Sequence, residues 1–233
     1  MTADVWEGGG ERPGWGGGVV ETTVHDDLVG APVPLREARK ERTRRALLDA
    51  ALALTDEVGF ASVSLRQVTK AAGIVPTAFY RHYDSMDALG ETLVVESFHS
   101  LRQMIRAVRS GGSDPAAVIT RSAEVLVSHV HAHREHFRFI ARERSGGVAA
   151  LRRSIHHELG VIVSELADDF ATFPVTEAWS GADRTLLAEL IVNQMVVVAE
   201  RILDSPDEEV DVVARAERQL TMVLVGAAQW RSR

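Results

Sequence analysis

The chain has 233 residues, which is enough for one or two domains with a sizeable core. It contains no cysteine, which excludes disulfides, thiol redox sensing and cysteine-ligated zinc, and its hydrophobic (45%) and charged (25%) fractions are those of an ordinary globular protein. Because no apolar run reaches the roughly 18 residues of a membrane helix and the N-terminus lacks a secretory signal, we expect a cytoplasmic protein without a membrane partner.

The net charge of −7 is unevenly distributed. Residues 36–82 hold nine Lys or Arg against five Asp or Glu, a balance of +4, which leaves −11 for the rest of the chain. A basic region joined to an acidic one suits binding of an anionic polymer at one end of the molecule only.

The first 35 residues are rich in glycine and proline and have no apolar period, which predicts a disordered tail. The spacing of Leu47, Ala51, Leu54 and Val58 then predicts a helix over 35–58 with one apolar stripe. Its basic N-terminal part precedes that stripe and favours contact with phosphates or a minor groove, over the alternative of a solvated helix end. The candidate contacts there are Arg39, Lys40, Arg42 and Arg44.

Residues 64–83 read as two short helices joined by a tight turn. Ser64 and Gln67 are spaced as a capping box, Gly73 is a helix stop, and Pro76 fits the first turn of the next helix. This second helix of about two turns is too short to be stable alone, so we expect Phe79 to be buried.

That arrangement has the geometry of a helix-turn-helix, whose second helix enters the major groove of double-stranded DNA. Polar side chains near the exposed edge can reach phosphates and base edges. The alternative is a small helical hairpin with solvated polar residues. The candidate DNA contacts from this region are Ser64, Arg66, Pro76, Thr77, Tyr80, Arg81 and His82.

The run Ala72-Gly73-Ile74, followed by Phe79-Tyr80-Arg81-His82-Tyr83, resembles the DNA-binding signature of the TetR family of bacterial regulators. Met86 stands where that family often has a lysine. Residues 64–110 and 136–170 are also similar to a subgroup, the repressors of unsaturated fatty acid synthesis and desaturation. The general resemblance extends from residue 36 to the end and implies an all-α, TetR-like fold of about nine helices.

The expected organisation is a helix-turn-helix domain over 36–84 and a ligand-binding and dimerisation domain over 85–233. Within the second, helices are predicted over about 85–110, 115–133, 135–144, 148–171, 183–203 and 207–230, with Asp183 and Asp207 as N-caps of the last two. These last two helices are long and apolar and resemble the family's dimer-forming pair. A homodimer would also place a second recognition helix one helical turn of DNA away, on a palindromic operator.

The apolar helices of the body can enclose a tunnel, although an ordinary helical core would have the same pattern. Arg142 and Arg144 either satisfy a helix C-terminus or pair with an acidic ligand head. The resemblance implies a fatty acyl-CoA or acyl-carrier thioester as effector. The candidate ligand-binding residues are Phe98, Met104, Phe137, Ile140, Arg142, Arg144, Ile162, Leu166, Met195 and Val198.

His129, His133 and His136 are spaced for one helix face, but no carboxylate or cysteine completes a metal motif, so we predict no metal and no resident cofactor. Motifs for phosphate loops and nucleophile elbows are also missing from the sequence. The residues therefore do not predict an enzyme, and the resemblance implies a repressor of lipid genes. Two alternatives remain open: a TetR-type regulator of an efflux or catabolic operon, and a lipid-binding helical carrier that does not bind DNA.

Overall fold

The computed structural model describes residues 35–109 and 115–232, apart from the side chains of residues 35, 104, 107–109 and 115–119. The predicted tail, except for Leu35, and the proposed cap Asp114 lie outside the described residues. Within them all regular secondary structure is helical, with these elements: α1 (Leu35–Val58), η1 (Phe60–Ser62), α2 (Leu65–Ala71), α3 (Pro76–Phe79), α4 (Met86–Arg109), α5 (Pro115–Ala132), α6 (Arg134–Glu143), α7 (Ala149–Phe170), α8 (Gly181–Asp204), η2 (Pro206–Glu208) and α9 (Glu209–Gln229).

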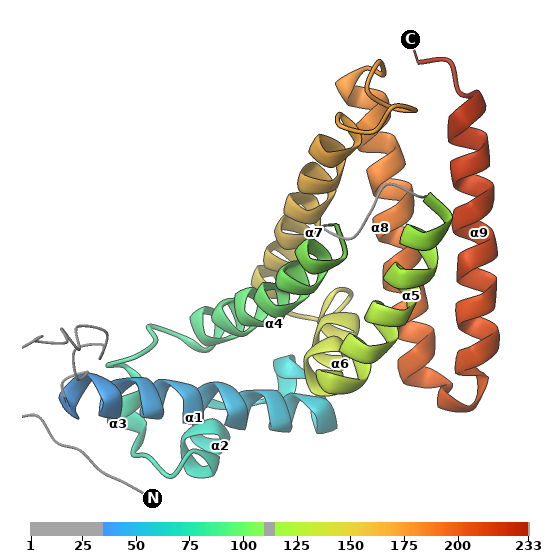
Figure 1. Cartoon of the computed structure of the whole chain (residues 1–233). Coiled ribbons are helices and arrows are strands. Elements are labelled where there is room, and N and C mark those ends of the chain that lie inside the picture. Colours follow the sequence, from blue (N-terminus) through green and yellow to red (C-terminus); the bar gives the residue numbers. More distant parts are fainter. Residues whose placement is uncertain (1–34, 110–114, 233) are drawn as a thin grey trace, which may run out of the picture.

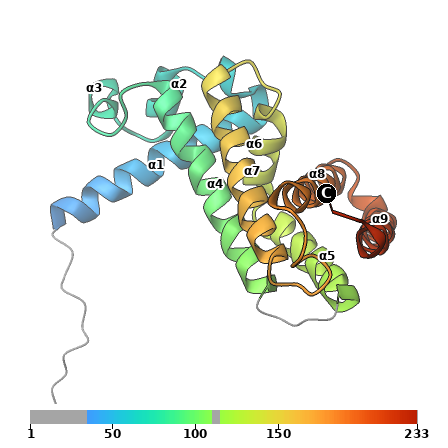
Figure 2. The same ribbon diagram turned by 90° about the horizontal axis from the view of Figure 1, so that it is seen from above.

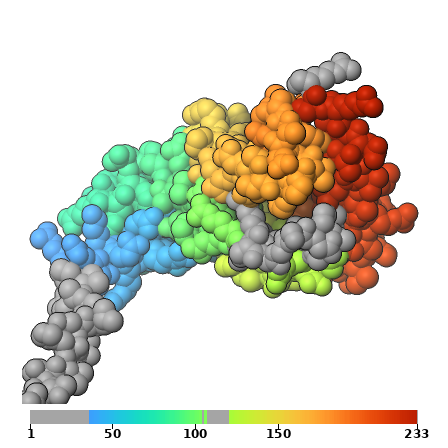
Figure 3. Space-filling view, turned by 45° about the horizontal axis from the view of Figure 1, so that its top comes forward, coloured from blue at the N-terminus to red at the C-terminus, as the bar shows by residue number. Residues whose placement is uncertain are grey.

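The N-terminal head, comprising α1 to α3, lies at one end of the molecule, and α9 lies at the opposite side (Figure 1). Helix α4 leads from the head into the body, where it packs on α7, and α7 packs in turn on α8. The space-filling view shows the head and the C-terminal helices as the two flanks of the molecule (Figure 3). The predicted all-α, TetR-like architecture is therefore confirmed.

One continuous core joins the head to the body. It includes Leu47 of α1 and Phe79 of α3, and it continues through Leu93 of α4 and Phe139 of α6 to Ile155 of α7, all fully or almost fully buried. Interiors packed in this way behave as solids and transmit displacements. The head is therefore held at a defined angle to the body.

Several local predictions were wrong. Val58 is 46% exposed, because α1 ends there and the chain turns away to bury Phe60 instead. The N-cap of α8 is Ser180, whose hydroxyl accepts from the backbone N–H of Asp183. Asp207 lies inside the 3-10 turn η2 rather than capping α9. Helix α3 has four residues and continues as turns, so it is shorter than the two turns expected.

Two helical glycines provide a matched test of packing at the head–body junction. A Cβ at Gly90 would lie 2.7 Å from both Leu151 Cδ1 and Phe60 Cζ, whereas one at Gly160 would meet nothing within 4 Å. We expect Gly160→Ala to raise the free energy of unfolding by about 0.5–1 kcal/mol, the helix-propensity gain over glycine. Gly90→Ala should lower it by ~1 kcal/mol, because overpacking outweighs the same gain.

Urea unfolding of both variants against the unmodified chain measures the two effects. An equal rise in stability for both would show that the junction at Gly90 is not closely packed.

Candidate nucleic-acid interface and ligand cavity

The turn between α2 and α3 is built by local backbone chemistry. The Ser64 hydroxyl accepts from the Gln67 N–H at 3.3 Å and the Gln67 Oε1 accepts from the Ser64 N–H at 2.9 Å, which completes the predicted capping box. Gly73 has φ of 67°, in the left-handed region that glycine adopts without strain, and Ile74 donates back to the Thr69 carbonyl at 2.9 Å. The turn therefore fixes where α3 begins.

Helix α3 has one buried and one exposed face. Phe79 is 0% exposed and its ring centroid lies 5.8 Å from that of Tyr83, whereas the neighbouring Tyr80 is 61% exposed. Thr77 and Arg81 are also exposed. This division between Phe79 and Tyr80 leaves the predicted recognition edge open to a partner.

His82 sits at the margin of that edge. Burial, followed by the positive charges of Lys40 and Arg81, lowers its pKa, and its Nδ1 is buried without a hydrogen-bond partner among the described residues. Its imidazole is therefore neutral at pH 7, and Lys40 from α1 and Arg81 from the turn after α3 lie close enough to act on the same ring. Figure 2 shows α3 and the N-terminal part of α1 on the same side of the molecule.

The basic residues of α1 fall into two groups. Arg39, Lys40 and Arg42 are exposed, as expected for phosphate contacts. In contrast, Arg44 donates to Glu41 Oε1 at 3.0 Å and to Glu96 Oε1 at 2.8 Å, so its guanidinium ties α1 to α4. Of the remaining predicted contacts, Ser64, Arg66 and Pro76 are exposed around the turn.

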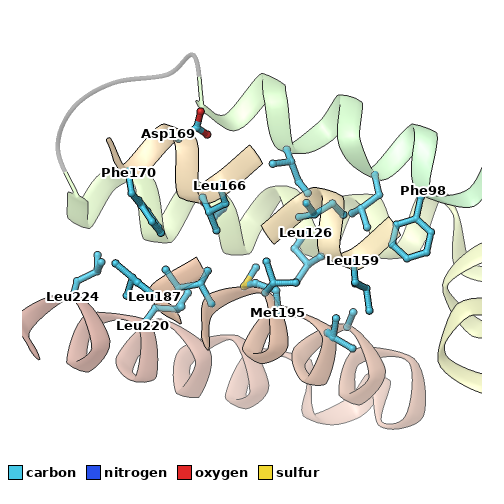
Figure 4. Close-up of a pocket in the computed structure, with 18 of the residues that line it drawn as sticks. Phe98, Leu126, Leu159, Leu166, Asp169, Phe170, Leu187, Met195, Leu220 and Leu224 are labelled. Atoms are coloured by element: carbon cyan, nitrogen blue, oxygen red, sulfur yellow. The ribbon is translucent and has the colours of Figure 1, made fainter. Parts of the chain in front are cut away.

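A cavity of about 830 Å³ lies in the body, between α4, α5, α6, α7, α8 and α9. Leucine, phenylalanine and methionine side chains from these helices point into it, including Phe98, Leu166 and Met195 (Figure 4). Its volume and apolar walls are those of a small-molecule site. Seven of the predicted ligand residues line it: Phe98, Phe137, Ile140, Arg144, Ile162, Leu166 and Met195.

Two predicted ligand residues lie elsewhere. The Arg142 guanidinium donates to the backbone carbonyls of Thr55 at 3.4 Å and Asp56 at 3.1 Å, because α6 turns this side towards the end of α1. Val198 is buried in a separate cluster between α5, α8 and α9. Met104 is among the residues whose side chains are not described.

The cavity also has walls that the sequence analysis missed. They come mainly from α5, the end of α7 and α9, where apolar periodicity is the same for core and cavity: Leu126, Leu159, Phe170, Leu187, Leu220 and Leu224. No signal in the sequence separates these residues from ordinary core.

One group of polar side chains lines the cavity where α4 meets α6. There the Ser97 hydroxyl lies 2.8 Å from His136 Nδ1, and Arg144 of the turn after α6 pairs with Glu200 of α8 at 2.9 Å. The Ser100 hydroxyl, which also lines the cavity, lies 3.3 Å from His129 Nε2. Burial lowers the pKa of His136 and, with the nearby His133, lowers that of His129 to about 4, so both rings are neutral at pH 7.

Helix α6 contacts the cavity and the head with different sides. Phe137, Ile140 and Ala141 line the cavity. The other side holds Arg142 on the last carbonyls of α1 and the buried Glu143, whose Oε1 accepts from the Phe60 N–H at 2.9 Å. This one helix therefore links the ligand cavity to the head.

Residues 47–93, which span the second half of α1, α2, α3 and the start of α4, match the family model for bacterial regulatory proteins of the tetR family. The matched segment is therefore similar to the DNA-binding part of that family, and it contains the turn and the exposed edge described above.

Similar solved structures have the same TetR fold. The fatty acid degradation regulator FadR from Bacillus halodurans aligns at 17% identity with a TM-score of 0.64, over 82% of this chain and 97% of its own. FadR from Bacillus subtilis in complex with stearoyl-CoA aligns at 15% identity with a TM-score of 0.61, over 77% of this chain and 96% of its own. A transcriptional regulator from Rhodococcus sp. Rha1 aligns at 21% identity with a TM-score of 0.61, over 80% of this chain and 96% of its own. At these identities the likeness concerns the fold alone.

Among the described residues, no group of three or more His, Asp or Glu side chains is placed to hold a metal ion. The ring centroids of His129 and His133 lie 4.4 Å apart, with the two rings tilted at 48° to each other. In the same part of the chain, no helix is long and apolar enough to cross a membrane.

The buried histidines give this TetR-type body a defined acid response. In the unfolded chain they take up protons near their usual pKa of about 6.5, whereas in the folded chain His129 does so only near pH 4. Both states are neutral above pH 6.5, so the free energy of unfolding should fall as the pH drops from 6.5 towards 4. His129→Gln should make that decline shallower.

Chemical unfolding of His129→Gln at pH 7.5 and pH 5 measures the slope, with the exposed His157→Gln as the matched control. The acid titration of carboxylates is common to both variants. An identical decline in both would show that His129 is not a titrating buried group.

Proposed function

We propose that this regulator is a ligand-responsive repressor of fatty acid or lipid metabolism genes, and that it acts as a homodimer on a palindromic operator. Its head would read double-stranded DNA, and its body would bind an acyl thioester or a related apolar ligand. The observation that carries the proposal is the contrast at the end of α3 between a fully buried Phe79 and the exposed Tyr80 that follows it. It gives a four-residue helix a rigid base and an open reading edge.

We propose a division of labour along the chain, with residues 36–84 reading DNA and 85–233 binding ligand and partner. Exposed cations on α1 would neutralise phosphates, whereas Thr77 and Tyr80 would contact the groove or its phosphates. Because Arg44 is held by Glu41 and Glu96, we assign it to positioning α1. The proposed contacts are Arg39, Lys40, Arg42, Ser64, Arg66, Pro76, Thr77, Tyr80, Arg81 and His82.

The proposed dimer surface lies on α8 and α9. Leu186 and Leu190 on α8, and Met222 and Val225 on α9, are large apolar side chains exposed in a single chain. Contiguous apolar patches on a protein surface mark association sites. A second copy packed on this pair of helices would bury them across a two-fold axis and set the spacing of the two heads.

An acyl ligand is supported by the size and apolar walls of the cavity. The FadR of Bacillus subtilis, with a similar fold, is in complex with stearoyl-CoA. Regulation of an efflux or catabolic operon by another apolar effector is the second reading, and native mass spectrometry of purified protein distinguishes the two by the mass of any co-purified ligand. A carrier without DNA binding is the third, and it predicts no salt-dependent affinity for duplex DNA.

Helix α6 gives ligand binding a route to the head. A ligand that prefers one position of Phe137 and Ile140 also prefers one position of Arg142 and Glu143, which hold the end of α1. Ligand affinity that differs between two head positions is what couples the two sites.

Tyr80→Ala should weaken operator binding by about 1–3 kcal/mol, because it removes an exposed groove-facing side chain without touching the core. Fluorescence anisotropy on a labelled operator duplex measures this change. Arg153→Ala, on the exposed face of α7, is the control and should bind normally. Unchanged affinity in a folded Tyr80→Ala dimer would remove Tyr80 from the interface.

Leu190→Asp should convert the dimer to monomers, since it places a charge in an otherwise apolar α8–α9 contact. Light scattering coupled to gel filtration reports the mass. Val95→Asp, at an exposed apolar position of α4, is the matched control and should remain dimeric. A dimeric Leu190→Asp variant would show that the two chains meet on another surface.

A further inference from the structure

The polar wall of the cavity has a chemical character that narrows the ligand. We call Ser97, Ser100, His133 and His136 the histidine–serine cluster; all four line the cavity, and the first two come from α4. The walls beside them are apolar, including Phe98, Leu101 and Phe137. In such a cavity a small number of polar groups fix the orientation and the identity of the ligand.

The hydrogen bonds of Ser97 fix the tautomer of His136. The Ser97 hydroxyl has one proton, and it donates this proton to the backbone carbonyl of Leu93 at 2.7 Å. The contact of 2.8 Å between Ser97 Oγ and His136 Nδ1 must then be a donation from Nδ1–H to the hydroxyl. In a neutral imidazole this leaves Nε2 as an acceptor, and no described protein group hydrogen-bonds to it.

The charges around the cluster disfavour an anionic group. Burial holds the pKa of both His136 and His129 below the usual value, so the wall is uncharged at pH 7. Arg144 is engaged by Glu200 at 2.9 Å. Among the described side chains that line the cavity, Arg144 is the one Lys or Arg, and its charge is already matched by Glu200.

We propose that the cavity selects an otherwise apolar ligand that carries an uncharged hydroxyl group, and that this hydroxyl donates its hydrogen bond to Nε2 of His136. This inference rests on the proposed function in that the cavity is the effector site; of the two ligand types named there, it selects a related apolar ligand over an acyl thioester. An ester carbonyl can only accept, so it leaves Nε2 unpaired, and a carboxylate brings a charge that the wall does not balance. A site built to bond a hydroxyl discriminates against analogues that lack one.

Three ligands with the same apolar chain separate these cases: dodecanol, methyl dodecanoate and dodecanoate. Their affinities for the full-length protein are measured by displacement of the neutral dye N-phenyl-1-naphthylamine. The unmodified protein should bind dodecanol about tenfold more tightly than either of the other two, as expected for one net hydrogen bond. Tightest binding of dodecanoate, or of the ester, would overturn the proposal.

Two variants test the role of His136. His136→Phe keeps the ring volume and should bring dodecanol to the affinity of the ester, while the ester affinity stays within about twofold. Ser97→Ala removes the hydroxyl that fixes the tautomer, so Nε2 can carry the proton and the ester should gain affinity relative to the alcohol. A dodecanol preference that persists in both variants would contradict the assignment.

The outcomes separate this inference from the proposed function. If the three ligands bind the unmodified protein equally well, the hydroxyl preference is wrong and the apolar effector site stands. If none of the three ligands displaces the dye, the hydroxyl preference and the assignment of the cavity as the effector site are both wrong. Operator binding by the same sample still tests the proposed DNA-binding role of the head.

Discussion

The contact between α6 and the end of α1 is the connection on which the rest of the structure depends. The last carbonyls of a helix have no partner within it, and here the Arg142 guanidinium donates hydrogen bonds to those of Thr55 and Asp56. The carboxylate of the next residue, Glu143, accepts a hydrogen bond from the Phe60 N–H just beyond the end of α1. Two adjacent side chains of α6 therefore hydrogen-bond to backbone groups of the head where α1 ends.

This joint has little freedom to adjust. Gly59 has φ of 79°, and a Cβ there would lie 3.1 Å from Arg142 Nε, so the guanidinium packs closely on the turn. A Cβ at Gly146 would lie 2.4 Å from Glu143 Oε2, which shows how tightly the chain folds back over the carboxylate. Because both sides are close-packed, a displacement of α6 moves the end of α1 rather than being absorbed between them. On the proposed function, this rigidity is what lets an apolar ligand act on a recognition helix with which it has no contact.

The sequence predicts those features that depend on local chemistry. Apolar periodicity located the long α-helices of the described residues, and the Ser64 capping box and the left-handed Gly73 followed from residue type alone. The orientation of α3 was also predictable, because a helix too short to be stable alone must bury its one aromatic anchor, Phe79.

Features that depend on distant partners were not predictable. Arg44 was predicted to contact DNA, yet its guanidinium is held by Glu96. Arg142 was predicted to contact a ligand, yet its guanidinium is held by the last carbonyls of α1. The cap of α8 was misplaced because Ser180 and Asp183 are both good N-cap residues, and only the backbone geometry distinguishes them. Cavity walls and core have identical periodicity: Val198 was predicted to line the cavity and lies in a core cluster instead, whereas Leu126, which was not predicted, lines the cavity.

The cavity also touches the surface that we propose for dimerisation. Val225 on α9 is 63% exposed in the single chain and lines the cavity as well, beside Leu224. A second copy packed on α8 and α9 would therefore close the outer side of the same cavity whose inner side is formed by α6. A ligand inside would then press on two elements at once: α6, which holds the end of α1, and α9, which on the proposed function packs on the partner. On that proposal, operator spacing depends on both the head angle and the dimer geometry, so one small apolar molecule would change the distance between the two recognition helices without reaching either.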